Sequence, residues 1–156
     1  MPPAAKIITV SDSTFQGQRE DRSGPAVAAL LERHRFDVSE CRVVPDGAEP
    51  VATAIGELAA GFVGAILTTG GTGFAPTDQT PEGTQAVLER LAPGLAEAMR
   101  AVSPLGRLSR GTAGTLGHCI VLNLPGSTTG AVECLEAVID VLPHAVALLT
   151  GQPTTH

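Results

Sequence analysis

Apolar residues along the chain form short continuous runs that alternate with longer stretches of helical spacing. The runs at 7–10 and 63–69 are nearly uninterrupted and rich in β-branched residues, which predicts buried strands, and a third strand is expected at 38–44. Between them, the stretches 24–35 and 51–61 place apolar residues three or four positions apart, which predicts helices. This alternation indicates a parallel sheet with helices packed on it.

The residues after the strand at 63–69 indicate two further helices. Thr80-Pro81-Glu82 combines a capping hydroxyl, a proline at the first helical position and an early acid, which predicts a helix that begins there and reaches Leu91. Pro93 opens another stretch of helical spacing, which Pro104 and Gly106 should end.

The last third of the chain predicts a hairpin followed by a long helical stretch. Glycines punctuate the apolar residues of 112–124, which indicates a hairpin whose second arm is 118–124. Helical spacing then runs over 130–149, where Pro143 should kink or divide the helix. The expected fold class is therefore α/β, a three-layer α/β/α sandwich with a mainly parallel sheet.

Composition places these elements in one unit. The chain has 156 residues, 43% of them hydrophobic, which predicts a single domain over residues 1–156. Cys41, Cys119 and Cys134 are odd in number and widely spaced, so they indicate neither a disulfide framework nor a zinc site. No segment has the pattern of a secretion signal or a membrane span. We therefore expect a cytoplasmic protein with no membrane partner.

The charge of the chain restricts the class of ligand. The net charge is −6 at pH 7 and the sequence pI is near 5.1, so the chain offers no basic surface for nucleic acid. We therefore do not expect nucleic acid as a partner. A small anionic ligand would need backbone amides, a few placed cations or a metal ion, because the overall field repels it.

A glycine-rich turn follows the expected central strand. Gly70, Gly71 and Gly73 surround Thr72 directly after Thr69, where bare backbone amides can approach a phosphate group. The same glycines can serve only to close a tight strand-to-helix turn that requires positive φ angles. Because no Gly-Lys-Ser/Thr follows, the turn is not a Walker motif.

Two aspartates are expected near this turn. Asp46 follows one strand and Asp78 lies just after the glycine-rich turn, so a parallel sheet can bring both to one edge, where two carboxylates can hold Mg²⁺. The alternative is structural, since Asp46 belongs to a Pro-Asp-Gly turn and Asp78 precedes a helix start.

Other strand ends offer weaker candidates. Pro125-Gly126-Ser127 and Ser11-Asp12 can each form part of a binding wall or merely a turn. Glu97 and Arg100 stand at helical spacing, typical of a solvated ion pair, with a functional role as the alternative. The histidines show no paired spacing, so we expect no histidine metal cluster.

Taken together, these motifs resemble the Mog/MoaB molybdenum cofactor biosynthesis family. The resemblance rests on the order and spacing of several segments: Ile8–Asp12, Asp21–Gly24, Pro45-Asp46, Thr68–Gly73, Asp78–Glu82, Glu97-x-x-Arg100, Leu108–Arg110 and Asn123–Ser127. It extends over nearly the whole chain.

The resemblance implies a homotrimeric, Mg²⁺-dependent enzyme that adenylylates molybdopterin with ATP and releases pyrophosphate. It also implies that Asp46 and Asp78 are the catalytic, metal-binding aspartates, and that a molybdotransferase receives the product. The positions that it assigns to nucleotide or pterin binding are Ser11, Asp12, Thr69, Gly70, Gly71, Thr72, Gly73, Glu97, Pro125, Gly126 and Ser127. One departure stands at Thr128-Thr129, where many family members carry Pro-Lys.

Two functions from other classes fit the same sequence. A catalytically silent paralogue would bind molybdopterin without transferring an adenylyl group. A structural oligomerisation module would bind neither substrate.

Overall fold

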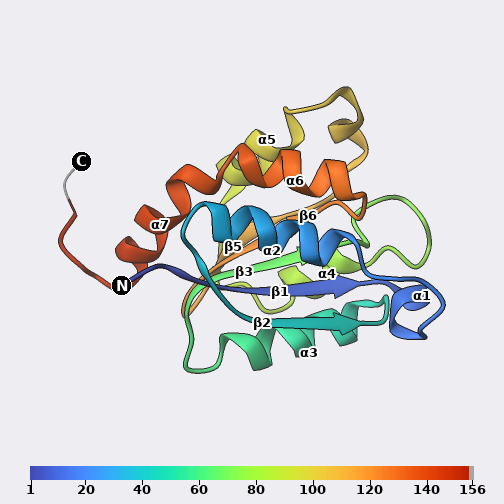
Figure 1. Cartoon of the computed structure of the whole chain (residues 1–156), viewed down its shortest axis with the longest axis horizontal. Helices are drawn as coiled ribbons and strands as arrows, with labels where there is room; N and C mark the ends of the chain where they lie inside the picture. The colour runs from blue at the N-terminus through green and yellow to red at the C-terminus, as the bar shows by residue number, and fades with distance from the viewer. Residues whose placement is uncertain (155–156) are drawn as a thin grey trace.

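A computed structural model of the chain, which describes residues 1–154, has a six-stranded sheet with helices on both faces (Figure 1). The strands lie in the order β2-β1-β3-β6-β5-β4. Their bounds are β1 Ala4–Val10, β2 Asp37–Val44, β3 Val63–Thr69, β4 Arg90–Leu91, β5 Ala113–Leu116 and β6 His118–Leu124. The strands β2, β1, β3 and β6 run parallel to one another, and β5 pairs antiparallel with both β6 and β4. The predicted three-layer fold with a mainly parallel sheet is confirmed.

The helices are divided between the two faces of the sheet. They are α1 Asp12–Phe15, α2 Ser23–Arg33, α3 Ala48–Ala59, α4 Thr80–Gln85, α5 Pro93–Arg100, α6 Thr128–Glu136 and α7 Leu142–Leu149, with short 3₁₀ helices η1 Pro104–Leu108 and η2 Ile139–Val141. In Figure 1, α2, α5, α6 and α7 cover one face, and α3 lies on the other.

Central strands contribute to both cores because neighbouring side chains point to opposite faces. Ile7 and Leu67 pack under α2 and α6, whereas Ile8 and Ile66 pack against α3. All four side chains are fully buried, which explains why β1 and β3 read as continuous apolar runs rather than alternating ones.

The helix predicted from Thr80 to Leu91 is shorter than expected. It ends at Gln85, and Arg90–Leu91 forms the edge strand β4 instead. The N–H of Glu89 donates to the carbonyl of Thr115, and the N–H of Ala92 donates to that of Ala113. Pairing with β5 therefore overrides the local helical preference.

The long helix predicted over 130–149 is divided, as Pro143 suggested. The helix α6 ends at Glu136, and Pro143 stands in the first turn of α7, where its missing N–H costs no hydrogen bond. Among residues 1–154, no helix is long and apolar enough to cross a membrane.

Candidate functional site

The carboxyl ends of β1, β2, β3 and β6 meet at one edge of the sheet and surround a polar pocket of about 320 Å³. In Figure 1 the arrowheads of β1 and β2 point toward this edge, where α1 also lies. Predicted site residues that line the pocket are Ser11, Asp46, Thr69, Gly70, Gly71, Asp78, Gly126 and Ser127. The parallel topology thus brings together segments that are far apart in the sequence.

Asp12 and Asp46 fix the ends of β1 and β2 against each other. The N–H of Asp12 donates to Oδ2 of Asp46 at 3.0 Å, and the N–H of Asp46 donates to Oδ1 of Asp12 at 2.9 Å. Asp46 lines the pocket, whereas Asp12 lies outside its lining. The Asp12 carboxylate therefore holds the turn that carries Asp46.

The carboxyl of Asp46 is electrostatically unusual. Partial burial raises its pKa above the ordinary value, and the negative charges of Asp12 and Asp78 raise it further, although the hydrogen bond from the backbone N–H of Asp12 acts in the opposite direction. A cation placed beside such a carboxyl would stabilise its charged form.

The glycine-rich turn has a structural need for glycine as well as a place in the pocket wall. Gly70 and Gly71 have φ values of 106° and 69°, which side chains disfavour. A Cβ on Gly71 would lie 2.3 Å from Oγ1 of Thr80 and 3.4 Å from Oδ1 of Asp46. The N–H of Gly70 already donates to the carbonyl of Leu124, so it is committed to the fold rather than to a ligand.

Asp78 is carried by the loop after the glycines, and Arg110 holds that loop. Oδ2 of Asp78 accepts a hydrogen bond from the N–H of Ala75 at 3.0 Å. The Arg110 guanidinium donates to the carbonyl oxygens of Gly73 (2.8 Å) and Asp78 (2.6 Å). It also forms an ion pair with Glu82 at 2.6 Å. Arg110 therefore ties both ends of the Asp78 loop to the start of α4.

Arg110 is a functional candidate that the reasoning from residue chemistry missed. In the sequence, only the Leu108–Arg110 match to the family includes this residue, because a single arginine between two loops has no local signature. The backbone N–H of Arg110 also donates to the carbonyl of Thr72, at 2.8 Å. Thr72 and Gly73 lie outside the pocket lining and form the part of the turn that Arg110 anchors.

The segment after β6 closes the pocket on its other side. Oγ1 of Thr69 donates to the carbonyl of Pro125 at 2.8 Å, which ties the ends of β3 and β6 together. A Cβ on Gly126 would lie 3.3 Å from Cα of Gly70, so the two loops are in close contact. Oγ of Ser127 accepts the N–H of Gly130 at 3.1 Å and caps α6.

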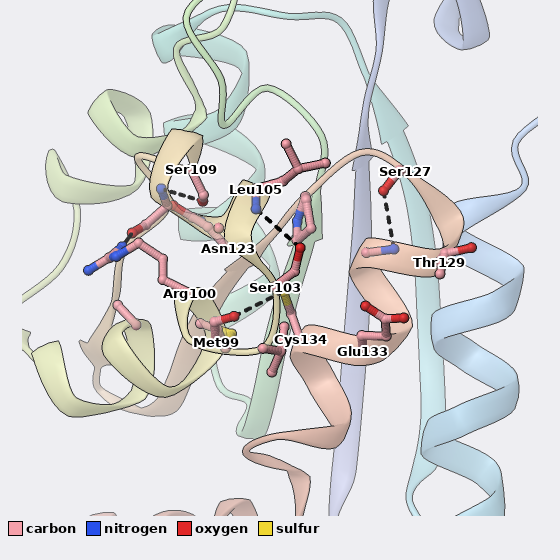
Figure 2. A pocket seen from close by; sticks show the side chains of 16 residues that line it. Met99, Arg100, Ser103, Leu105, Ser109, Asn123, Ser127, Thr129, Glu133 and Cys134 are labelled. Carbon is pink, nitrogen blue, oxygen red and sulfur yellow. Dashed lines mark hydrogen bonds between the residues drawn. The ribbon is translucent and has the colours of Figure 1, made fainter.

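A second, mostly apolar pocket of about 280 Å³ lies between α5, η1 and the start of α6 (Figure 2). Met99, Val102, Leu105 and Cys134 form much of its apolar lining. Pro125 lines this pocket, and Ser127 lines both pockets, so the two cavities adjoin at the end of β6.

Glu97 is not brought together with the other predicted site residues. It is exposed on α5 and lines neither pocket, because the helical period turns Ala96 and Met99 toward the core instead. Arg100 lines the apolar pocket and donates to the carbonyl of Gly111 at 2.7 Å. Within residues 1–154 it forms no ion pair with Glu97.

The ability of the polar pocket to hold a metal rests on two carboxylates. In the described part of the chain, no group of three or more His, Cys, Asp or Glu side chains is arranged to hold a metal ion. Asp46 and Asp78 line the same pocket, and the charge of Asp78 contributes to the raised pKa of Asp46. This hard-oxygen donor set fits Mg²⁺, which is commonly held by one or two carboxylates together with substrate phosphates.

Comparisons with known proteins identify the family and the fold of the chain. A family described as "Probable molybdopterin binding domain" matches residues 6–144. The chain is similar to the molybdopterin biosynthesis enzyme MoaB from Thermus thermophilus, with a TM-score of 0.90 and 45% identity over 99% of this chain and 100% of that structure.

Curated relatives differ in length. The chain is 34% identical to the molybdopterin adenylyltransferase of Helicobacter pylori, covering 93% of this chain and 86% of that protein. It is 36% identical to the molybdenum cofactor synthesis protein cinnamon of Drosophila melanogaster over 92% of this chain. It spans only 25% of the length of that second relative.

Proposed function

The chain belongs to the family of molybdopterin-binding domains, and we propose that it acts in molybdenum cofactor biosynthesis by transferring the adenylyl group of ATP to molybdopterin. The observation that carries this proposal is the placement of Asp46 and Asp78 in one polar pocket beside the glycine-rich turn. The adenylyltransferase named among the relatives supports the reaction type.

In the proposed reaction, an oxygen of the terminal phosphate of molybdopterin attacks the α-phosphorus of ATP. A new P–O bond forms, the bond between the α-phosphorus and the bridging oxygen to the β-phosphate breaks, and pyrophosphate leaves with that oxygen. Such a transfer requires positioning and charge neutralisation rather than a covalent protein intermediate. We assign the orientation of the phosphate groups to Ser11, Gly71 and Ser127, and their position in the lining of the polar pocket supports this assignment.

We assign Asp46 and Asp78 to Mg²⁺, which would neutralise charge on the phosphate oxygens. The raised pKa of Asp46 supports this role, because a cation between mutually repelling carboxylates favours their charged form. Asp12 and Arg110 are positioning residues, because they hold the turns that carry these aspartates.

The apolar pocket supplies a place for a heterocyclic ring. Its apolar side chains suit a flat aromatic surface, and Ser127 joins it to the polar pocket. A substrate with a ring in one cavity and a phosphate in the other would pass the end of β6, where Pro125 and Gly126 lie.

The assembly and cellular setting are part of the proposal. We propose a homotrimer in the cytoplasm that delivers its product to a molybdotransferase. A relative from Synechococcus elongatus, named a molybdenum cofactor biosynthesis bifunctional protein, supports a physical link between two activities of this synthesis.

Asp78→Asn tests the proposed function. The protein is incubated with molybdopterin, ATP and Mg²⁺, and both pyrophosphate and adenylylated pterin are measured. The variant should lose at least about a hundredfold in rate while keeping its fold, because it removes a charged metal ligand. Asp37→Asn is the matched control, since Asp37 is exposed at the opposite end of β2.

Other outcomes separate the alternatives. A folded wild-type protein that releases no pyrophosphate but binds molybdopterin would be a silent paralogue, an alternative favoured by the uncharged Thr128-Thr129. A protein that binds neither substrate would be a structural module. Turnover by Asp78→Asn at the wild-type rate would remove the metal role assigned to Asp78.

A further inference from the structure

Two cationic side chains in the lining of the polar pocket have no role in the reaction proposed above. Arg19 and Arg22 lie in the segment between α1 and α2, and both line the pocket together with Asp46 and Asp78. They are the only Lys or Arg side chains in the lining that the structure describes.

Neither side chain has a protein partner within residues 1–154. The ion pairs in that part of the chain involve Arg42 and Arg110, and no side-chain hydrogen bond is formed by Arg19 or Arg22. Other arginines near the site are committed, because Arg110 holds the Asp78 loop and Arg100 donates to Gly111. Arg19 and Arg22 thus remain available to an anion.

The backbone that carries Arg22 is held in place by its neighbour. Oδ2 of Asp21 accepts from Oγ1 of Thr9 at 2.8 Å, and Oδ1 of Asp21 accepts from the N–H of Gly24 at 3.0 Å. A Cβ on Gly24 would lie 2.5 Å from Oδ2 of Asp21, so glycine is needed for this close approach. The Asp21 side chain therefore joins β1 to the start of α2. These bonds fix the position of the backbone next to Arg22.

The charge balance of the pocket shows why these arginines matter. Four acidic side chains, Glu20, Asp21, Asp46 and Asp78, share the lining with the two arginines. On the α6 side, Ser127 and Thr128 contribute no charge. A polyphosphate entering this pocket meets carboxylates and needs cations in addition to one divalent metal ion.

From these observations we propose that Arg19 and Arg22 bind the polyphosphate end of the nucleotide, beyond its α-phosphate. Guanidinium groups suit this task because their forked donors can each contact two phosphate oxygens. In the transfer reaction they hold the pyrophosphate that leaves. This inference rests on the proposed function and assigns its leaving-group subsite to residues of this chain.

Binding measurements on Arg19→Ala, Arg22→Ala and the double variant test the inference, with Mg²⁺ present and with ATP, pyrophosphate, AMP and inorganic phosphate as separate probes. Each single variant should bind ATP and pyrophosphate roughly tenfold more weakly than wild type, because a charge-assisted contact is lost. The double variant should bind them more weakly still. AMP and inorganic phosphate should keep their wild-type affinities. Arg22→Lys should retain part of the affinity, since it keeps the charge but loses the fork.

Arg33→Ala is the matched control, because Arg33 is exposed at the other end of α2, about 16 Å along the helix axis from Arg22. Thermal unfolding of each variant verifies that it is folded. If the variants bind ATP and pyrophosphate as tightly as wild type, the inference is wrong while the proposed function stands. If the variants lose as much affinity for AMP or inorganic phosphate as for ATP and pyrophosphate, the polyphosphate assignment is wrong. A wild-type protein that binds neither ATP nor pyrophosphate would overturn both proposals.

Discussion

Asp46 shows how a single residue can combine a structural role with the chemistry of the site. Its backbone N–H and its carboxylate both bond to Asp12, so the turn after β2 is fixed to the end of β1. The same carboxylate is partly buried and faces the charges of Asp12 and Asp78, and its pKa is raised. Charge at this position therefore opposes folding in the absence of a cation.

Asp46→Asn should consequently make the metal-free protein more stable at neutral pH. Because the folded-state pKa is raised, protonation of Asp46 stabilises the fold fully below the unfolded-state pKa, and this contribution is lost as pH rises through the folded-state pKa. The asparagine side chain stays uncharged at every pH, so the variant does not lose this stability as pH rises. The gain should be on the order of a few tenths of a kcal/mol, because solvent screens a partly exposed charge.

Urea unfolding with EDTA, at neutral pH and below the unfolded-state pKa of about 4, checks this prediction. The difference between the Asp46→Asn variant and wild type should disappear at the lower pH. A variant that is less stable than wild type at neutral pH would mean that the bond from Asp12 outweighs the repulsion.

At the scale of elements, the loop from Gly73 to Asp78 depends on an arginine from another part of the chain. Arg110 contacts the carbonyls of Gly73 and Asp78 and pairs with Glu82 in α4. Arg110→Ala should lower the transfer rate by roughly ten- to a hundredfold, because a displacement of about 1 Å in a catalytic group has effects of that size. The Mg²⁺ concentration needed for half-maximal rate should rise as well.

Glu82→Gln separates the ion pair of Arg110 with Glu82 from the contacts of Arg110 with the carbonyls of Gly73 and Asp78. This variant weakens the ion pair but keeps Arg110 and both carbonyl contacts, so its rate and its Mg²⁺ dependence should stay close to wild type. If Arg110→Ala lowers thermal stability while the Mg²⁺ dependence of the remaining activity is unchanged, Arg110 is structural only.

The outcome for single elements shows what sequence patterns can and cannot predict. The buried strands β1 and β3 were predicted closely, because short continuous apolar runs bounded by turn residues are typical of strands buried on both faces. The strand β4 was missed, since its two residues depend on hydrogen bonds from β5 rather than on their own preference. The spacing of Glu97 and Arg100 did not indicate which of the two lines a pocket, because a spacing pattern does not state which helical face meets a cavity.

At the scale of the whole molecule, the site exists because four parallel strands end at the same edge. The sequence predicted that meeting point for Asp46 and Asp78 from topology, and the polar pocket contains both. It could not predict the unpaired state of Arg19 and Arg22 or the second pocket beside α5, because both depend on how loops pack in three dimensions. Resemblance supplied the reaction, which no spacing of residues specifies.

Ligand binding should be visible in the stability of the whole molecule. A ligand that binds only the folded state at 100 times its Kd adds about 2.7 kcal/mol to the free energy of unfolding. For a chain of this size, that corresponds to a rise in Tm of about 5–10 °C. ATP with Mg²⁺ should therefore raise the Tm of wild type, and EDTA should reduce the rise, because Asp46 and Asp78 would then face the phosphates without a cation. Asp78→Asn should show a smaller rise at the same ATP concentration, whereas Arg33→Ala should match wild type. An ATP-induced rise that is equal with Mg²⁺ and with EDTA would argue against a metal between the two aspartates.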